Sequence, residues 1–396
     1  MTIVLNKKVF ITGANRTPIG KFQGKLSKVK ATKLGSICIS SAIQKSNIKP
    51  ENVDYIIFGN MLTAGEGMTP ARQSAIESGI PTSSSALTIN KACASGIQSV
   101  ILAAQSIKVG DGSIIAAGGM ENMSLSPHVL VNSRTGSRLG NAKLVDTLIN
   151  DGLWCPFENR HMGDSAEFIA SKYKIKREDQ DKFAEDSHSK AIRAINNNDF
   201  KSEITSVQIN HKKSSFTFSQ DEGPRSDAIF EKLNTLKHAF TLGDSVTAGN
   251  ASQISDGASA MIVRDEDSIN NTSGPIALIT GYAHSANDPG LIFDAPPDAL
   301  DNLLFKTNSK LSDFDLIEIN EAFAAQVLAN EKRIGWDRNK VNINGGAIAL
   351  GHPVGASGAR ILTTLIHSLN NNKLKRGLAL ICHGGGGAVA MSIELI

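Results

Sequence analysis

Two stretches of the chain, one in each half, show the same succession of apolar and polar positions. In the first half, the apolar run at residues 86–90 has the length of a buried strand and is followed by a turn of small residues. A helix comes next, because apolar side chains recur there at three- and four-residue steps: Ile97, Val100, Ile101, Ala104 and Ile107. A second strand is predicted over residues 113–117, ending at two glycines.

The same order recurs near the C-terminus. Residues 341–344 are predicted as a strand, and a glycine-rich turn leads from them into a helix. The apolar side of that helix is formed by Ile361, Leu362, Leu365, Ile366 and Leu369. Residues 378–381 form the next predicted strand, which ends at Cys382 and a run of glycines. This repetition predicts an α/β fold with two similar halves.

The segment between the halves, about residues 121–250, is more polar and contains one helical pattern over residues 177–196. It has the character of an inserted loop domain. Such an insertion is either a solvated excursion or a cover that shapes a ligand cleft. Residues 270–275 are the best candidate linker, so we expect an N-terminal domain over 1–270 and a C-terminal domain over 271–396.

Composition and charge argue against several classes of partner. The chain has 396 residues, of which 41% are hydrophobic and 20% charged, with a formal net charge of only +3. Basic and acidic residues are interspersed, so neither nucleic acid nor an anionic membrane is an expected partner. We find no targeting pattern at the N-terminus and expect no segment of membrane-spanning length, which predicts a cytoplasmic protein.

The four cysteines lack the spacing of a metal site and are too few for a disulfide framework, so we expect reduced thiols and no bound metal. Cys93 is the best candidate for chemistry, because it lies between a predicted strand and a predicted helix among small residues. A helix N-terminus favours a thiolate and stabilises an oxyanion. Small residues at a helix start also serve tight packing, and most single cysteines are inert and buried.

Three further side chains occupy similar places. His352 lies in a loop of small residues, where an imidazole can activate a thiol, although a lone histidine is more often structural. Cys382 ends a predicted strand and is followed by His383 and four glycines, which are equally compatible with a simple tight bend. Asn320 ends another predicted strand and either positions a water or an oxyanion, or caps a helix.

Together these segments resemble the thiolase family. The resemblance is carried by NKACASG at residues 90–96, NEAFAAQ at 320–326, GGAIALGHPVGASGAR at 345–360 and CHGGGG at 382–387, and it is extended by GGMENMS at 118–124, HMGDSAE at 161–167 and VTAGNAS at 246–252. These motifs span nearly the whole chain in the family's order. The resemblance implies a duplicated αβαβα layered core with an inserted loop domain.

The resemblance also implies roles for the candidate residues. Cys93 would attack a thioester and hold the acyl group, while His352 takes its proton. Cys382 would be the acid/base on the second substrate, and Asn320 would hold a water that stabilises the enolate. The backbone amides of Cys93 and Gly384 would form a second oxyanion hole. The substrates would be coenzyme A thioesters, with no permanently bound cofactor.

Substrate contacts follow from the same resemblance, at His161, Met162, Arg225, Ala248, Ser252 and Phe323. The histidine at position 161 is typical of short-chain members, so we expect reversible condensation of two acetyl-CoA molecules to acetoacetyl-CoA. A homo-oligomer, tetramer or dimer, is expected as well. Two departures from the family pattern are Gln253, where glycine is common, and His383, where an aliphatic residue is common, and the loop at residues 288–296 is also unusual.

Three alternatives stay open. A degradative 3-ketoacyl-CoA thiolase would use the same catalytic residues on longer chains. A non-catalytic acyl-CoA or lipid carrier would bind without acyl transfer to cysteine. A metal site built from Cys93, Cys382, His352 and His383 is disfavoured by the ligand spacing.

Overall fold

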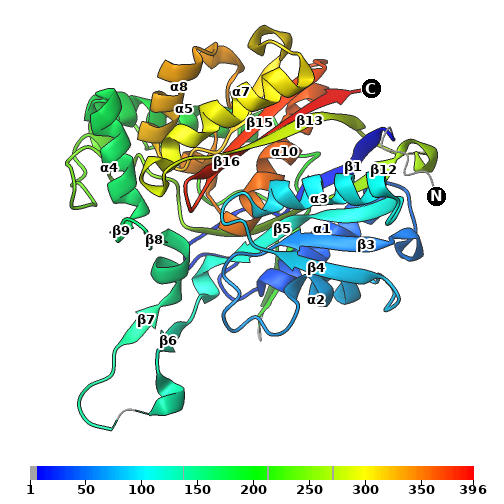
Figure 1. Ribbon diagram of the computed structural model, residues 1–396, viewed down its shortest axis with the longest axis horizontal. Helices are drawn as coiled ribbons and strands as arrows, with labels where there is room; N and C mark the ends of the chain where they lie inside the picture. Colours follow the sequence, from blue (N-terminus) through cyan, green and yellow to red (C-terminus); the bar gives the residue numbers. More distant parts are fainter. Residues whose placement is uncertain (1–6, 137, 212–213, 270–271) are drawn as a thin grey trace.

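The computed structural model describes residues 7–136, 138–211, 214–269 and 272–396. Within these residues a ten-stranded mixed sheet runs through the molecule, and all but one of its strands follow a single path in space (Figure 1). In spatial order the path is β14 (Leu316–Ile319), β15 (Arg376–His383), β16 (Gly387–Leu395), β13 (Ala277–Ala286), β1 (Val9–Arg16), β12 (Ser255–Asp265), β5 (Ile114–Asn122), β3 (Tyr55–Gly59) and β4 (Ser85–Ile89). The short β2 (Gly20–Lys21) pairs with β12.

Helices form three layers with the strands between them (Figure 1). One outer layer contains α1 (Ala31–Lys45) and α2 (Pro70–Glu77), and the other contains α7 (Ala295–Thr307) and α8 (Ala324–Ile334). The middle layer is α3 (Ser95–Val109) and α10 (Val354–Asn371), which contact strands of both halves. The expected αβαβα layered core is therefore confirmed.

Side-chain alternation along the strands produces this layering. Ile56 packs in the core beneath α1, whereas its neighbour Ile57 packs against the middle helices. In the second half, Leu380 belongs to the core under α7 and α8, and Ile381 belongs to the middle core. Successive strand residues point to opposite faces, so strands that are covered on both faces are apolar at every position.

The two halves repeat one arrangement. In the first, β4 lies parallel to β3 and leads into α3 and then β5. In the second, Val341 lies parallel to Ile317 of β14, and the chain continues through α10 into β15, which is parallel to β14. The predicted helices and the order of elements are thus confirmed, although both helices begin earlier than the apolar pattern alone indicates.

The predicted strand at residues 341–344 is wrong, because only the bridge between Val341 and Ile317 forms. Asn342 takes a left-handed backbone conformation with φ of 44°, and its side chain bonds the backbone of Ile319 instead. Its Oδ1 accepts from the Ile319 N–H at 2.8 Å and its Nδ2 donates to the Ile319 carbonyl at 2.9 Å. Side-chain bonds replace the ladder of a strand here.

The predicted end of the strand at Gly118 and Gly119 is also wrong, because β5 continues to Asn122. Both glycines pair with β12, and Gly119 faces the start of α10. A Cβ at Gly119 would lie 2.1 Å from the Gly355 carbonyl oxygen, so a glycine is required for this close approach rather than for a bend.

The two central helices touch where each begins. A Cβ on Gly96 would lie 2.7 Å from the Ala359 nitrogen, and a Cβ on Gly358 would lie 2.5 Å from the Ile97 nitrogen. Any larger side chain would push the helices apart. The segments that precede α3 and α10 therefore meet, although they are about 260 residues apart.

The segment between β5 and β12 covers one end of the layered core. It contains α4 (Met162–Tyr173), α5 (Arg177–Asn196), α6 (Phe230–Leu233) and three small hairpins: β6 (His128–Leu130) with β7 (Leu144–Asp146), β8 (Trp154–Cys155) with β9 (Arg160–His161), and β10 (Val207–His211) with β11 (Ser214–Phe218). The predicted helix over 177–196 is confirmed as α5. The β6–β7 hairpin extends away from the rest of the molecule (Figure 1).

A buried arginine anchors this insertion to the core. Arg16 of β1 donates to both carboxylate oxygens of Asp221, at 2.6 and 2.8 Å, and to Glu203 at 2.5 Å. All three side chains are buried. Removing one partner of such a group leaves an unpaired buried charge and costs about 3–5 kcal/mol.

One segment has the length and composition of a membrane span, contrary to the sequence expectation. Among the described residues, Ala92–Val109 is a helical stretch of 18 residues with mean hydropathy 1.2. It is the central helix α3 with its preceding turn, and it packs against α10 and β5. Its apolar character is accounted for by burial in the middle layer, among the strands of both halves.

Candidate active site

The N-terminal ends of the two central helices open into one cavity of about 300 Å³. Eight of the eleven predicted site residues line it: Cys93, His161, Met162, Ser252, Phe323, His352, Cys382 and Gly384. Residues from both halves and from the insertion contribute to its wall. The two cysteines and the histidine on which the sequence analysis depends therefore share one space.

A strained turn holds Cys93 at the wall of the cavity. Ala92 has φ of 46°, which a non-glycine residue rarely adopts. Asn90 Oδ1 accepts from the Ala92 N–H at 2.9 Å, and the Ser95 hydroxyl donates to the Ala92 carbonyl at 2.7 Å while accepting from the Lys91 N–H. These bonds fix the turn between β4 and α3 so that the sulfur lies half-buried at the surface of the cavity.

The sulfur of Cys93 carries a proton at neutral pH. Burial raises its pKa to about 11, and hydrogen bonds from the backbone amides of Cys93 and Gly384 offset this only in part. The helix terminus favours a thiolate, as expected from the sequence, but desolvation outweighs it here. Activation of this thiol requires a base, and the two amides that face the sulfur are those expected to form an oxyanion hole.

His352 has the protonation state that such a base requires. The Ser357 hydroxyl donates to the Pro353 carbonyl at 2.9 Å, so it accepts from His352 Nδ1, which lies 2.6 Å away. This assigns the imidazole proton to Nδ1 and leaves the lone pair on Nε2. Burial, and secondarily the charge of Arg360, lowers the pKa of His352 to about 3. The ring is therefore neutral at physiological pH.

Cys382 is buried near the end of β15 and lines the same cavity. Burial first, and the neighbouring Cys93 second, raise the pKa of this thiol well above its usual range. The turn that follows brings the backbone of Gly384 against Ala92, since a Cβ there would lie 3.5 Å from the Ala92 Cβ. His383 Nδ1 lies 2.8 Å from the Gly384 carbonyl, and burial lowers the pKa of its ring.

Asn320 is buried at the end of β14 and does not cap a helix, because α8 begins at Ala324. Its Nδ2 lies 3.4 Å from His352 Nε2. Its Oδ1 has no hydrogen-bond partner among the described residues. A buried amide oxygen without a partner is costly, and a water or a ligand would satisfy it.

An aromatic wall closes the cavity. His161 stacks on Phe240 with ring centroids 4.9 Å apart, and Phe323 packs edge-on against Phe240 at 6.2 Å and Phe293 at 5.6 Å. His161 Nδ1 accepts from the Gly163 N–H at 3.0 Å, so the proton lies on Nε2 and remains free to donate. Burial lowers the pKa of His161, which keeps the ring neutral.

Gln253 is tied to backbone groups rather than extended into the cavity that it lines. Its Nε2 donates to the carbonyls of Gly223, Ile348 and Ala349 at 2.9–3.2 Å. The unusual side chain therefore joins the insertion to the loop that carries His352. In the other unusual segment, Ile292 and Phe293 both line the cavity.

The remaining predicted residues lie elsewhere. Arg225 lines a separate surface groove of about 450 Å³, together with Lys182, His188 and Ser226. Ala248 is exposed and lines neither space. Asn320 is absent from the cavity wall and reaches the site through His352.

Several residues of the site were not found from the sequence. Ser357, which sets the tautomer of His352, lies five residues after it in the chain. The only feature of the sequence that could have indicated this role is its position one helical turn after Pro353. Glu121 accepts from the backbone of Met61, Leu62 and Gly355 across the two halves. Phe240 carries no signal in the chain, because its place in the cavity depends on long-range packing.

No group of three or more His, Cys, Asp or Glu side chains is placed to hold a metal ion within the part of the chain that the structure describes. Cys93, Cys382, His352 and His383 line the cavity without forming such a group.

A layered α/β core with two thiols and a neutral imidazole in one cavity defines a class of protein: an acyltransferase that uses cysteine. Comparison with known proteins identifies the family. The thiolase N-terminal domain model matches residues 9–267 and the thiolase C-terminal domain model matches residues 273–395. The chain belongs to the thiolase family.

Relatives and solved structures agree over nearly the whole chain. The acetyl-CoA acetyltransferase of Cupriavidus necator is 47% identical over 388 residues, which cover 98% of this chain and 99% of that protein. The crystal structure of the Bacillus anthracis acetyl-CoA acetyltransferase superposes with a TM-score of 0.96 at 39% identity, covering 98% of this chain and 99% of that one. The human mitochondrial 3-ketoacyl-CoA thiolase gives 0.94 at 37% identity and covers 99% of each chain.

Proposed function

We propose that this protein catalyses the reversible Claisen condensation of two acetyl-CoA molecules to acetoacetyl-CoA and free coenzyme A. The observation that carries the proposal is the convergence of Cys93, His352 and Cys382 on one cavity. The names of the relatives at 47% and 39% identity support acetyl-CoA as the substrate.

In the first half-reaction, Cys93 attacks the thioester carbonyl while Nε2 of His352 takes the thiol proton. The tetrahedral oxyanion is stabilised by the backbone amides of Cys93 and Gly384, which already face the sulfur. The carbon–sulfur bond to coenzyme A breaks, and the leaving sulfur receives the proton from His352. The acetyl group remains on Cys93.

In the second half-reaction, Cys382 as the thiolate removes an α-proton from a second acetyl-CoA. The raised pKa of this thiol makes its thiolate a strong base once it forms. Enolate charge is met by a water that donates one hydrogen to the open Asn320 Oδ1 and the other to the enolate oxygen. The enolate carbon attacks the acetyl carbonyl, the bond from that carbon to sulfur breaks, and Cys93 leaves as a thiolate. Cys93 then takes the proton that Cys382 removed, which restores both thiols to their starting states.

We propose that the insertion binds coenzyme A. Its pantetheine end would pass Ser252, whose N–H bonds the Ala322 carbonyl at 3.0 Å. Arg225 and Lys182 in the surface groove supply positive charge for the nucleotide phosphates. Ala248 is assigned to the same path by family resemblance. No bound cofactor beyond these substrates is required by the reaction.

We propose that the chain consists of an N-terminal domain over 1–270, with its insertion over about 121–250, and a C-terminal domain over 271–396. The two family models that end at 267 and begin at 273 support this division. The predicted linker begins at residues 270 and 271, which lie outside the described residues.

A short acyl chain is supported by the aromatic wall of Phe240, Phe293 and Phe323 with His161 around a cavity of only about 300 Å³. The likeness to the human 3-ketoacyl-CoA thiolase supports a longer-chain degradative activity as the second candidate. The ratio of kcat/KM for cleavage of acetoacetyl-CoA to that of a ten-carbon ketoacyl-CoA separates the two. A ratio above one supports the short-chain enzyme, and a ratio below one refutes it.

We also propose a cytoplasmic homo-oligomer, a tetramer or dimer. Support comes from the exposed apolar side chains of the β6–β7 hairpin, Leu130, Val131, Leu139 and Leu144, and from the outer edge of β4, which pairs with no strand among the described residues. A carrier without turnover remains testable by mass spectrometry of the intact protein after exposure to acetyl-CoA. A single acetyl group mapped to Cys93 supports the enzyme, and binding without acylation would refute it.

A further inference from the structure

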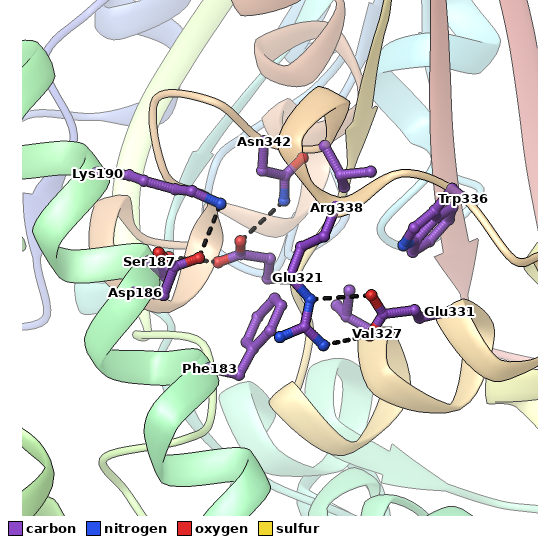
Figure 2. Close-up of a pocket in the computed structure, with 11 residues that line it drawn as sticks. Phe183, Asp186, Ser187, Lys190, Glu321, Val327, Glu331, Trp336, Arg338 and Asn342 are labelled. Atoms are coloured by element: carbon purple, nitrogen blue, oxygen red, sulfur yellow. Dashed lines mark hydrogen bonds and ion pairs between the residues drawn. The ribbon is translucent and has the colours of Figure 1, made fainter.

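A buried carboxylate lies directly behind the catalytic wall. Glu321 is only 1% exposed and follows Asn320 in the chain. Its Oε1 accepts from Asn342 Nδ2 at 2.8 Å, and its Oε2 accepts from the Ser187 hydroxyl at 2.7 Å and from the Ile348 N–H at 3.2 Å. Figure 2 shows the carboxylate between Ser187 and Asn342.

The three donors come from three separate parts of the fold. Ser187 belongs to α5 of the insertion, Asn342 braces the end of β14, and Ile348 lies in the short helix α9 (Ala347–Leu350) that precedes His352. Ser187 also accepts from the Gly346 N–H at 3.1 Å, so its single proton is directed to Glu321. All the groups that surround the carboxylate are donors, and only the ionised form accepts from all of them.

The fit around this carboxylate is tight. A Cβ on Gly346 would lie 2.2 Å from the Glu321 carboxyl carbon, so the loop that leads to His352 packs directly on it. On the other side of Glu321 in the chain, the Ala322 carbonyl accepts from the Ser252 N–H and Phe323 lines the cavity. Within this segment, Asn320 and Phe323 therefore face the catalytic site, whereas the carboxylate of Glu321 lies behind its wall.

We propose that Glu321 is a positioning residue for the condensation step, holding Asn320 at His352 and linking both to helix α5 of the insertion. This inference rests on the proposed function. Glu321 touches no substrate, and it acts through the backbone at the end of β14. Substitution by glutamine places an N–H₂ group where a donor already points, which pushes Ile348 or Asn342 away and displaces the Asn320 amide.

The test measures two steps separately, acylation of Cys93 by acetyl-CoA and exchange of the acetyl α-protons in deuterated buffer. In Glu321→Gln, α-proton exchange is expected to fall roughly ten- to hundredfold, because a displaced amide no longer places its water. Acylation of Cys93 and KM for acetyl-CoA are expected to stay near wild type. Ser187→Ala, which removes one donor and keeps the carboxylate, is expected to show a smaller loss of exchange.

A second, smaller pocket, separate from the catalytic cavity, is lined by both Glu321 and Glu331, and Glu331 is therefore a matched control. Glu331 pairs with Arg338, as Figure 2 shows, and within the part of the chain that the structure describes it has no hydrogen bond to the segment that contains Asn320. Glu331→Gln is expected to exchange like wild type. A double variant gives the decisive measurement: if Glu321 acts through Asn320, adding Glu321→Gln to Asn320→Ala causes no further loss.

The inference would be overturned if the two substitutions lowered the rate of α-proton exchange independently, so that their effects multiplied in the double variant. An exchange rate equal to that of the wild type in Glu321→Gln would also overturn it. Equal losses of acylation and exchange in that variant would also overturn it, because they indicate general disruption. The proposed function fails differently, by the absence of both acyl-Cys93 and exchange in the wild-type enzyme, and that result would remove the basis of this inference as well.

Discussion

The two halves of the core use one arrangement in different ways. Asn60 follows β3 in the first half as Asn320 follows β14 in the second, and Cys93 precedes α3 as His352 precedes α10. Asn60 donates to the buried carboxylate of Glu121 at 2.7 Å, which accepts backbone bonds that join the halves. Nδ2 of Asn320 instead lies 3.4 Å from His352 Nε2, so the two asparagines differ in the partner of Nδ2, while Oδ1 of each has no hydrogen-bond partner among the described residues.

The repeated arrangement therefore fixes where the side chains lie, and the differences between the two halves determine which of them can take part in catalysis. In the first half, a complete strand, β4, leads into the strained turn that holds the nucleophile Cys93. In the second half the equivalent strand is reduced to one bridge, and the longer loop that follows carries the neutral His352 to the same cavity, where Asn320 reaches it from the end of β14. Four predictions sharpen the contrast.

The largest effect is expected at the two thiols. Cys93→Ser should lose covalent acylation and lower turnover by roughly a thousandfold or more, because the serine hydroxyl is a far weaker nucleophile beside the same base. Cys382→Ser should still form the acyl-enzyme but lose α-proton exchange. Intact mass and deuterium exchange measure the two steps, and an acylated Cys93 variant would reverse the assignment.

His352→Ala is expected to lower the rate of acylation by about 10²–10⁴-fold, the usual contribution of a general base. Ser357→Ala keeps the imidazole and removes only the partner of Nδ1, so its loss should be much smaller. Stopped-flow release of coenzyme A gives both rates. If acylation were as slow in Ser357→Ala as in His352→Ala, the orientation of the ring rather than its basicity would limit the rate.

The paired asparagines test the comparison directly. Asn320→Ala should lower α-proton exchange by roughly ten- to hundredfold while leaving thermal stability nearly unchanged. Asn60→Ala should lower the free energy of unfolding by about 1–3 kcal/mol, since a buried carboxylate loses its partner, and should leave exchange near wild type. Finding the reverse pattern would show that the halves had been assigned the wrong roles.

The smallest effect is expected from pH on acylation. Because the pKa of His352 is lowered to about 3, the ring stays unprotonated throughout the neutral range, and acylation should be flat from about pH 5 to 9. Exchange should instead rise about tenfold per pH unit there, because the raised pKa of Cys382 leaves only a small thiolate fraction that grows with pH. An inflection of acylation near pH 6.5 would contradict a neutral buried histidine.

Most of the fold and the central site could be predicted from the chain. Local apolar spacing identified α3, α5 and α10, and short motifs identified Cys93, His352 and Cys382. The failures were at residues 341–344 and at the glycines of β5, where local propensity was overridden. A side chain of Asn342 replaced a strand, and a close approach of α10 converted an apparent bend into a paired strand.

The sequence by itself determined which residues can attack, accept a proton and pack at period 2 or 3.6, because these properties belong to single side chains and to their neighbours within a few positions. Only the tertiary structure decided the protonation states of these side chains and which other residues lie next to them. Burial where the two halves meet keeps both thiols protonated and His352 neutral, and contacts between residues far apart in the chain bring Phe240 to the cavity and Glu121 and Ser187 to positions behind its wall. Desolvation and long-range packing depend on the whole fold, and no local pattern specifies them.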